Sequence, residues 1–193
     1  MEQDTSTRIL EIARDILATR GLAALSFDAV AKRLGRSKQA VLYWYPSKSD
    51  LLAALFVPCL SKEADAAEDA VRSATGRSDA IRSYVRGIAA FHIADLDRFR
   101  LMYLLPQTIR PTGQSGTDAK MLEKVHPVTD RIYAVLASHL YGDPAKARAE
   151  AVAIHSSVLG LVAMIGLADS LNDPMKQTSQ ELIEALIRAF RAE

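Results

Sequence analysis

The sequence has a single cysteine, Cys59, among its 193 residues. One thiol cannot form an intrachain disulfide, and it excludes a zinc site built from several thiolates. Net charge is equally scarce, because 24 Lys and Arg residues stand against 23 Asp and Glu residues and leave a formal charge of +1. A chain of this kind does not bind nucleic acid through bulk charge, so any nucleic-acid interface must be local.

The sequence also shows little of the patterns that mark strands, signal peptides and membrane spans. Apolar residues recur at every third and fourth position rather than in β-branched alternation, which predicts an all-α fold. The first residues are polar, so we expect no signal peptide. Residues 151–168 lack formal charge, but His155, Ser156 and Ser157 interrupt them and favour a buried helix over a membrane span. We therefore expect a cytoplasmic location without membrane contact.

Patterns for catalysis and metal binding are missing as well. The sequence shows no triplet of nucleophile, base and orienting residue, no phosphate-binding loop and no metal cluster, so we expect neither an enzyme nor a bound cofactor. The four histidines form no HxxxH or HxxE pair, which argues against a metal effector.

Apolar periodicity, caps and helix breakers divide the chain into predicted helices. The first four run from about Thr5 to Arg20, from after Ser26 to Leu34, from about Ser37 to Tyr45, and onward from a capping box at residues 47–50. Further helices are expected near 60–72, 78–94, 96–105, 118–141, 144–170 and 178–191, with a loop at 106–116 that contains two Pro and two Gly. We place a domain boundary at residue 50, which leaves residues 1–50 and 51–193 as two domains.

The two short helices before residue 46 meet at Gly35 and follow a longer helix, which is the pattern of a helix-turn-helix. In the second short helix, Val41 and Tyr45 lie four residues apart and are expected to face the core with Leu34. The outward-pointing residues are then Lys38, Gln39 and either Leu42 or Tyr43.

The same region concentrates positive charge. Residues 29–49 contain no Asp or Glu, and their basic residues are Lys32, Arg33, Arg36, Lys38 and Lys48. Such a run is commonly only a solvated face. At the start of a recognition helix, however, Lys pairs with guanine and Gln with adenine, and Arg36 and Lys48 at its two ends are placed to hold phosphates. The helix N-termini at Ser26 and Ser47 add backbone N–H donors for phosphate oxygens.

Residues 37–52 read Ser-Lys-Gln-Ala-Val-Leu-Tyr-Trp-Tyr-Pro-Ser-Lys-Ser-Asp-Leu-Leu and resemble the signature of TetR-family regulators. Gly21-Leu22, residues 26–31 and Leu34-Gly35 resemble the first two helices of that family at the same spacing. The resemblance implies an N-terminal three-helix helix-turn-helix domain followed by a C-terminal helical domain for ligand binding and dimerisation.

The resemblance also implies roles for individual residues. Lys48 matches the family's phosphate-binding Lys, and Ser37, Lys38 and Gln39 match its variable base-reading positions. The ungapped match places Leu42 where the family has an aromatic phosphate contact, so Tyr43 or Trp44 takes over that contact, or both pack inside. The resulting candidate DNA contacts are Ser26, Arg36, Ser37, Lys38, Gln39, Ala40, Tyr43, Trp44 and Lys48.

The last two predicted helices suggest a dimer. Small residues on the 144–170 helix permit close approach of another helix, and they are Ala153, Ser156, Ser157, Gly160, Ala163 and Gly166. Together with the apolar stripe of the 178–191 helix, they predict half of an intermolecular four-helix bundle. An intramolecular hairpin without a partner is the alternative.

An effector pocket is the other expectation for the C-terminal domain. Adaptable apolar and aromatic side chains with a few polar tips line small-molecule sites, although such residues are commonly ordinary core. The candidates are Phe91, His92, Phe99, Met102, Tyr103, His126, Tyr133, His155 and Met164. We expect a lipophilic or aromatic effector that releases a dimeric repressor from a near-palindromic operator in double-stranded DNA. The alternative is a helical small-molecule-binding or protein-interaction module with weak or lost DNA binding.

Overall fold

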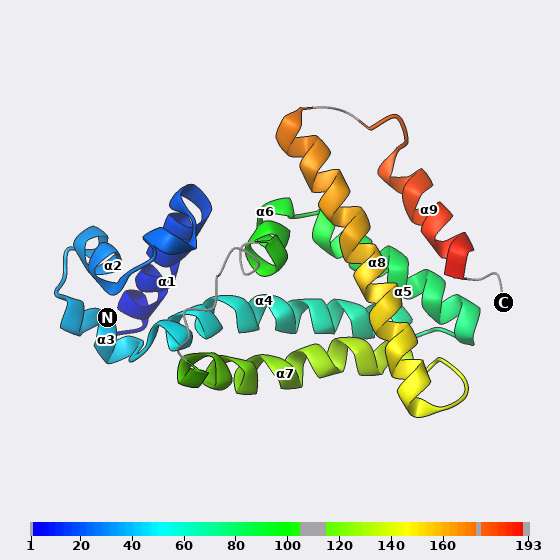
Figure 1. Cartoon of the computed structure of the whole chain (residues 1–193), viewed down its shortest axis with the longest axis horizontal. Coiled ribbons are helices and arrows are strands. Elements are labelled where there is room, and N and C mark those ends of the chain that lie inside the picture. Colours follow the sequence, from blue (N-terminus) through cyan, green and yellow to red (C-terminus); the bar gives the residue numbers. More distant parts are fainter. Residues whose placement is uncertain (1, 105–114, 173–174, 191–193) are drawn as a thin grey trace. The chain divides into compact units, whose positions relative to one another are not determined.

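The computed structural model describes residues 2–104, 115–172 and 175–190. Helices are the only regular elements within these ranges, which confirms the all-α prediction (Figure 1). Two compact units share the chain. The first combines Met1–Leu60 with Asp97–Pro127, and the second combines Ser61–Leu96 with Val128–Glu193. The domain boundary at residue 50 stays a prediction.

The first unit begins with α1 (Glu2–Arg20), the short 3-10 helix η1 (Leu22–Ala24), α2 (Phe27–Leu34) and α3 (Lys38–Trp44). It continues into the first half of α4 (Lys48–Val71). Its core is made by one apolar stripe from each helix, and includes Ile9, Ala13, Ile16, Leu17, Val30, Leu34, Val41, Leu51 and Leu55. Removing these stripes from water is the main force that holds α2 and α3 in place.

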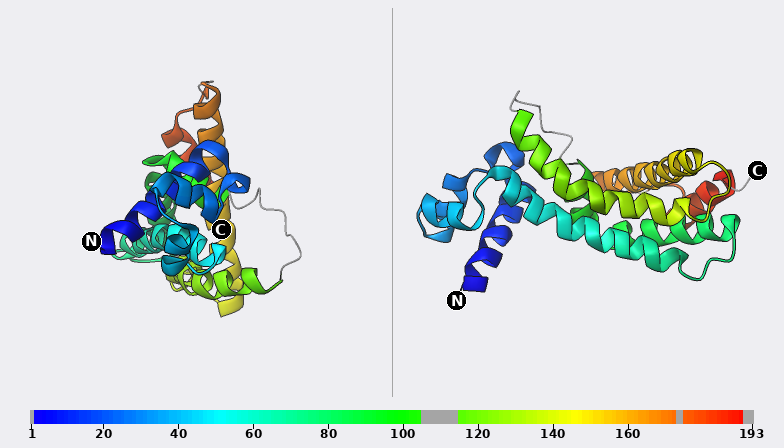
Figure 2. Two further views of the ribbon diagram at one scale, coloured as in Figure 1. Left: turned by 90° about the vertical axis from the view of Figure 1, so that its left-hand side faces the viewer. Right: turned by 90° about the horizontal axis from the view of Figure 1, so that it is seen from below.

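The second unit contains the end of α4, α5 (Arg77–Ile93), the end of α7 (Ser115–Ala137), α8 (Pro144–Leu171) and α9 (Ser179–Phe190). α5 packs against α8 and α9, and α8 and α9 lie side by side (Figures 1 and 2). Oδ1 of Asp143 caps α8 by accepting the N–H groups of Ala145 and Lys146 at 3.0 and 3.1 Å. Thr178 and Glu181 form a capping box before α9.

Two predicted helix boundaries are wrong. α4 is one helix from Lys48 to Val71, whereas the sequence suggested a separate helix at 60–72. Pro58 lies inside α4 on its exposed face, and the buried stripe continues past it through Leu55, Leu60 and Ala64. Burial of that stripe outweighs the cost of an interior proline, about 3 kcal/mol.

The segment after α5 also differs from the prediction of one helix at 96–105. It forms the short α6 (Leu96–Phe99) followed by a π-helix, η2 (Arg100–Leu104). The predicted loop at 106–116 lies outside the described residues as far as residue 114, and α7 begins at Ser115.

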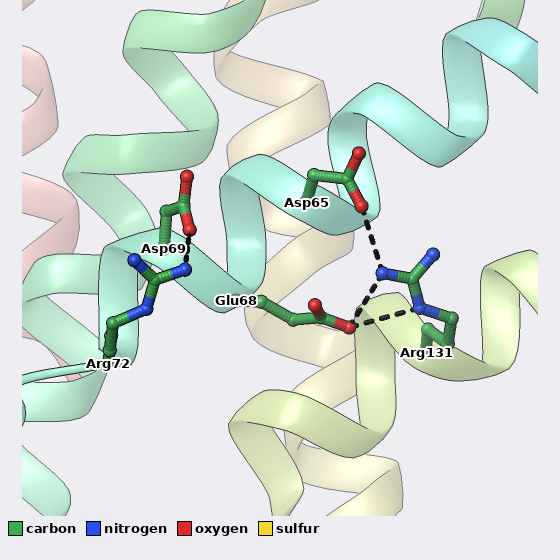
Figure 3. A network of polar contacts seen from close by, with 5 residues as sticks. All are labelled: Asp65, Glu68, Asp69, Arg72 and Arg131. Atoms are coloured by element: carbon green, nitrogen blue, oxygen red, sulfur yellow. Dashed lines mark hydrogen bonds and ion pairs between the residues drawn. The ribbon is translucent and has the colours of Figure 1, made fainter.

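Within the second unit, Arg131 of α7 bridges to α4 (Figure 3). Its Nη2 lies 2.9 Å from Oδ1 of Asp65 and 2.9 Å from Oε1 of Glu68. Nearby on α4, Arg72 pairs with Asp69 (Figure 3). Exposed pairs contribute little stability individually, but one guanidinium shared by two carboxylates favours a single register of α7 along α4.

Candidate functional site

α2 is capped at both ends by residues that the sequence pattern predicts. At its start, Oγ of Ser26 accepts the N–H of Ala29 at 3.1 Å. At its end, Gly35 adopts φ 69° and ψ 30°, a left-handed conformation in which a side chain would be strained. The N–H of Arg36 donates to the carbonyl of Ala31 at 3.1 Å and closes the turn. Local hydrogen bonds therefore direct the chain from α2 into α3.

α3 is anchored on its inner side. Oγ of Ser37 accepts the N–H of Ala40 at 3.3 Å and caps the helix. Val41 is 0% exposed, and Tyr45, which follows the helix, is also buried. The Tyr45 hydroxyl forms a hydrogen bond of 2.8 Å with Oγ of Ser6 on α1. The inner face of α3 thus consists of the residues that the four-residue spacing predicts.

The opposite side of α3 is open. Lys38 and Gln39 are exposed, and Tyr43 is 75% exposed. Gln39 and Tyr43 are four residues apart, so they occupy the same face one turn from each other. Leu42 is partly buried, whereas Trp44 packs against the core and meets the Tyr43 ring edge-on with 5.5 Å between centroids. Tyr43 is therefore the aromatic side chain that this face presents.

Lys38 makes an ion pair that the sequence analysis missed. Its Nζ lies 2.9 Å from Oδ2 of Asp28 in the first turn of α2. The two side chains are 50% and 71% exposed, so water and salt screen the pair. The sequence signal for this pair is weak, because ten residues and a helix turn separate its partners.

The start of α4 brings together a candidate phosphate-binding residue and a capping box. Nζ of Lys48 donates to the carbonyl of Leu22 at 3.5 Å, and partial burial lowers the pKa of Lys48. Oγ of Ser47 accepts the N–H of Asp50 at 3.1 Å and donates to its carboxylate at 2.6 Å. Lys124 of α7, in the same unit, binds that carboxylate at 2.7 Å. The hydrogen bonds from Lys124 and Ser47 lower the pKa of Asp50.

The predicted effector contacts fall into both units. The first unit holds Phe99, Met102, Tyr103 and His126, and the second holds Phe91, His92, Tyr133, His155 and Met164. In the first unit, Phe99 and Met102 are buried, and the rings of Phe99 and Tyr103 lie 5.6 Å apart. His126 and Met164 are exposed. The remaining four candidates of the second unit come together.

These four residues gather near a buried acidic residue that the sequence analysis missed. Glu63 of α4 is 0% exposed, and its Oε1 accepts a hydrogen bond from Nε2 of His92 on α5 at 2.8 Å. Nε2 of His155 on α8 lies 3.5 Å from the same oxygen. Phe56 and Leu60 precede Glu63 at helical spacing, so an acidic residue on the apolar stripe of α4 was the available signal.

Tyr84 of α5 extends this cluster. Its hydroxyl donates to the carbonyl of Ile132 at 3.1 Å and lies 3.0 Å from Nδ1 of His155. The second bond joins the hydroxyl to Nδ1 of His155, and the imidazole tautomer decides which of the two donates. Burial lowers the pKa of His155 to about 4 and raises that of Tyr84. Both side chains are therefore neutral near pH 7.

Aromatic rings surround the polar atoms of this cluster. The Tyr133 ring meets the His155 ring edge-on at 5.4 Å between centroids, and the Phe91 ring meets the His92 ring at 5.0 Å. The guanidinium of Arg148 lies over the Tyr133 ring, 5.6 Å from the ring centroid. No group of three or more His, Cys, Asp or Glu side chains in the described part of the chain is arranged to hold a metal ion.

α8 is the one helix in the described ranges that is long and apolar enough to cross a membrane. Apolar helices inside water-soluble proteins pass the same criterion of length and composition. The most apolar window of α8 has a mean hydropathy of 2.0, and 33% of that window is buried within the chain. Much of the apolar surface of α8 is therefore left uncovered by this single chain.

Residues 9–55 match the family described as bacterial regulatory proteins, tetR family. The chain is 31% identical over 108 residues to an HTH-type transcriptional regulator of Mycobacterium tuberculosis, covering 54% of this chain and 45% of that protein. It is 32% identical over 88 residues to the HTH-type transcriptional regulator EthR of Mycolicibacterium smegmatis, covering 46% and 40%. The chain thus spans less than half the length of these curated relatives.

Solved structures with a similar fold cover almost the whole chain. One regulatory protein aligns over 98% of this chain and 97% of its own, with a TM-score of 0.73 and 19% identity. The multidrug binding protein EbrR, solved in complex with imidazole, aligns over 95% of this chain and 93% of its own, with a TM-score of 0.59 and 20% identity. At such low identity the alignments establish the fold, a helix-turn-helix followed by a helical C-terminal part.

Proposed function

Because the chain belongs, through residues 9–55, to the tetR family of bacterial regulatory proteins, we propose that it is a transcriptional regulator that binds double-stranded operator DNA through α3. It acts in the cytoplasm as a homodimeric repressor that a small-molecule effector releases from DNA. It is not an enzyme, and it needs no membrane and no cofactor.

The observation that carries the DNA-binding role is the open face of α3. Lys38, Gln39 and Tyr43 are exposed on a helix whose other side is fixed to the core. In the major groove, Gln39 can pair bidentately with adenine and Lys38 with guanine, while the Tyr43 hydroxyl reaches a phosphate. Ala40 and Trp44 are partly buried, so they set how closely α3 approaches the bases.

Three further residues are proposed to hold the phosphates beside that groove. Arg36 precedes α3 and Lys48 opens α4, so the two positive charges flank α3 in the chain. Ser37 caps α3 and stands at a base-reading position. Ser26 accepts a backbone N–H group as the cap of α2, which leaves its hydroxyl proton available to a phosphate oxygen. These contacts position the protein on DNA without specifying its sequence.

A gel shift of the purified protein with its own promoter region tests this role. Lys48→Ala should weaken binding to all DNA sequences about equally and reduce the slope of log affinity against log salt by about one. Gln39→Ala should instead relax the preference at one base pair. The control Lys146→Ala removes an exposed charge from the first turn of α8 and should change neither property. No shift at low salt, or unchanged binding by a Lys38→Ala, Lys48→Ala double variant, contradicts the proposal.

The exposed face of α8 supports the proposed homodimer. Met164, Leu167 and Leu171 are 54%, 50% and 66% exposed, and their spacing places them on one stripe. The same stripe of a second copy can cover it, with α9 of each copy completing a four-helix bundle. A two-fold dimer presents two copies of α3 to successive major-groove faces, which requires a near-palindromic operator.

Sedimentation at micromolar protein concentration tests the dimer. The wild-type chain should sediment with twice its monomer mass, and Leu167→Glu should shift it toward the monomer because a charge is buried at the contact. Leu122→Glu is the matched control, since Leu122 is also exposed, at 47%, but lies on α7 in the first unit. A monomeric wild-type protein contradicts the proposed bundle.

An effector site in the second unit completes the proposal. Phe91, His92, Tyr133 and His155 gather there, and among proteins of similar fold EbrR was solved with imidazole bound. Such an effector releases DNA only if it binds the released state more tightly than the DNA-bound state. The alternative of a helical module without DNA binding is favoured by Leu42 alone, and the gel shift separates the two functions.

A further inference from the structure

The second unit contains a buried carboxylate, and the packing of its helices does not require an acidic residue at that position. Glu63 is 0% exposed on the stripe of α4 that also carries Leu60, Ala64 and Ala67. Removing a carboxylate from water costs several kcal/mol, and apolar residues of similar volume commonly pack as well or better at such positions. A chemical role in binding is therefore a better reason for an acidic residue at this position than stability is.

The atoms around Glu63 define what kind of ligand it suits. Its Oε1 already accepts an N–H from His92 at 2.8 Å, so the oxygen points at a nitrogen donor. Nε2 of His155 lies 3.5 Å from the same oxygen, and Nδ1 of that ring is hydrogen-bonded to the hydroxyl of Tyr84. An incoming N–H donor can thus bind the carboxylate oxygen beside the two imidazoles. An incoming anion meets the carboxylate and is repelled.

The aromatic neighbours also favour a positively charged ligand. The rings of Phe91 and Tyr133 pack against the two imidazoles, and rings of this kind attract a cation over their faces. Tyr133 already shows this behaviour, since the guanidinium of Arg148 lies 5.6 Å from its centroid. A positively charged nitrogen attached to an apolar aromatic body matches both the carboxylate and the rings.

We propose that Glu63, His92 and His155 recognise the protonated nitrogen of a lipophilic aromatic amine. This inference rests on the effector response proposed above and specifies its chemistry. The ammonium takes the place of a histidine N–H on Oε1 of Glu63, and the aromatic body packs among the rings. The three residues belong to α4, α5 and α8, so binding changes the spacing of three helices, one of which begins at Lys48.

Three probes that share one apolar body and differ in the charge of their polar group test which charge the site prefers. Phenylbutylamine, phenylbutanol and phenylbutyrate are titrated calorimetrically into the purified full-length chain without DNA. The amine should bind about tenfold more tightly than the alcohol, because a charge-assisted hydrogen bond is stronger than a neutral one, and the butyrate should bind least. Equal affinities, tighter binding of the butyrate, or no binding of the amine at millimolar concentration overturns the proposal.

Two substitutions assign the preference to Glu63. Glu63→Gln keeps the shape of the side chain and should bring the amine down to the affinity of the alcohol, while alcohol binding persists. Asp69→Asn removes an exposed carboxylate of α4 and should keep the wild-type preference. An amine preference that survives Glu63→Gln overturns the assignment. If Glu63→Gln fails to fold, the order of the three probes on the wild-type chain still decides.

The DNA-binding proposal fails or stands separately. If the chain binds the amine but shifts no DNA, the ligand chemistry holds and the proposed regulator is wrong. If the chain shifts DNA but shows no preference for the amine, the regulator holds and the ligand chemistry is wrong.

Discussion

The ammonium of Lys38 lies 2.9 Å from the carboxylate of Asp28, so the first residue of α3 is paired with the first turn of α2. The same ammonium is the proposed partner of a guanine edge. In the proposed recognition, Lys38 exchanges this carboxylate for DNA when α3 enters the groove. Asp28 competes with DNA for this side chain and also repels nearby phosphates.

Asp28→Asn should consequently strengthen DNA binding. At low salt, affinity for specific and unspecific DNA should rise by roughly threefold to tenfold, as expected for the loss of one exposed opposing charge, and the gain should shrink with added salt. Fluorescence anisotropy with labelled DNA at two salt concentrations measures this effect. Asp69→Asn, which removes an exposed carboxylate paired with Arg72 in the second unit, is the control. A weaker-binding Asp28→Asn protein would show that Asp28 positions Lys38 for DNA instead of competing for it.

Gly35 should be replaceable only by residues that tolerate a left-handed backbone. Its φ of 69° costs a residue with a side chain about 1 kcal/mol, although no atom lies within 4 Å of an added Cβ. Gly35→Ala should lower the free energy of unfolding by about that amount, and Gly35→Asn should lower it less. Urea unfolding compares the three proteins. Equal losses for Ala and Asn would mean that backbone conformation is not the cause.

At Gly87 a side chain is excluded by a close neighbour and not by the backbone conformation. A Cβ at this position would lie 2.6 Å from Cβ of Ala70, where α5 crosses α4 in the second unit. Gly87→Ala should therefore destabilise the chain by about 1–3 kcal/mol despite the higher helix propensity of Ala. Ala90→Ser is the control, because Ala90 is an exposed residue of the same helix. Thermal unfolding that leaves Gly87→Ala as stable as the control contradicts the tight crossing.

Stability should fall in acid because His155 is buried in its neutral form. Its pKa is about 4 in the folded chain against 6.5 without burial, so between these values the unfolded chain binds one proton more. The free energy of unfolding should therefore decrease as pH falls from about 6.5 toward 4, by at most about 3 kcal/mol from this residue, and His155 should add no slope above pH 7. His155→Gln should flatten the profile over that interval. An unchanged slope in His155→Gln assigns the acid sensitivity to other groups.

Local signals in the sequence were sufficient for the helix-turn-helix. Ser26, Ser37 and Gly35 act within three or four residues, so their residue types predict the caps that the structure contains. The spacing of Val41 and Tyr45 likewise predicts the buried side of α3.

Features that depend on distant parts of the chain were not predictable in this way. The continuity of α4 through Pro58 depends on burial against other helices, which outweighs the local signal of the proline. Glu63 acquires its role from His92 and His155, which lie on two other helices. Sequence patterns placed both histidines among candidate ligand contacts, but only the fold joins them to a carboxylate.

Recognition of an operator through α3 can be measured by letting the purified protein select binding sites from a random pool of double-stranded DNA. Enrichment of a near-palindromic sequence is expected, with half-sites about one helical turn apart or a multiple of it and one position per half-site that loses its preference in Gln39→Ala. Recognition of DNA through α3 would be contradicted if no sequence were enriched at low salt. It would also be contradicted if the wild type and Gln39→Ala enriched the same sequence with equal preference at every position.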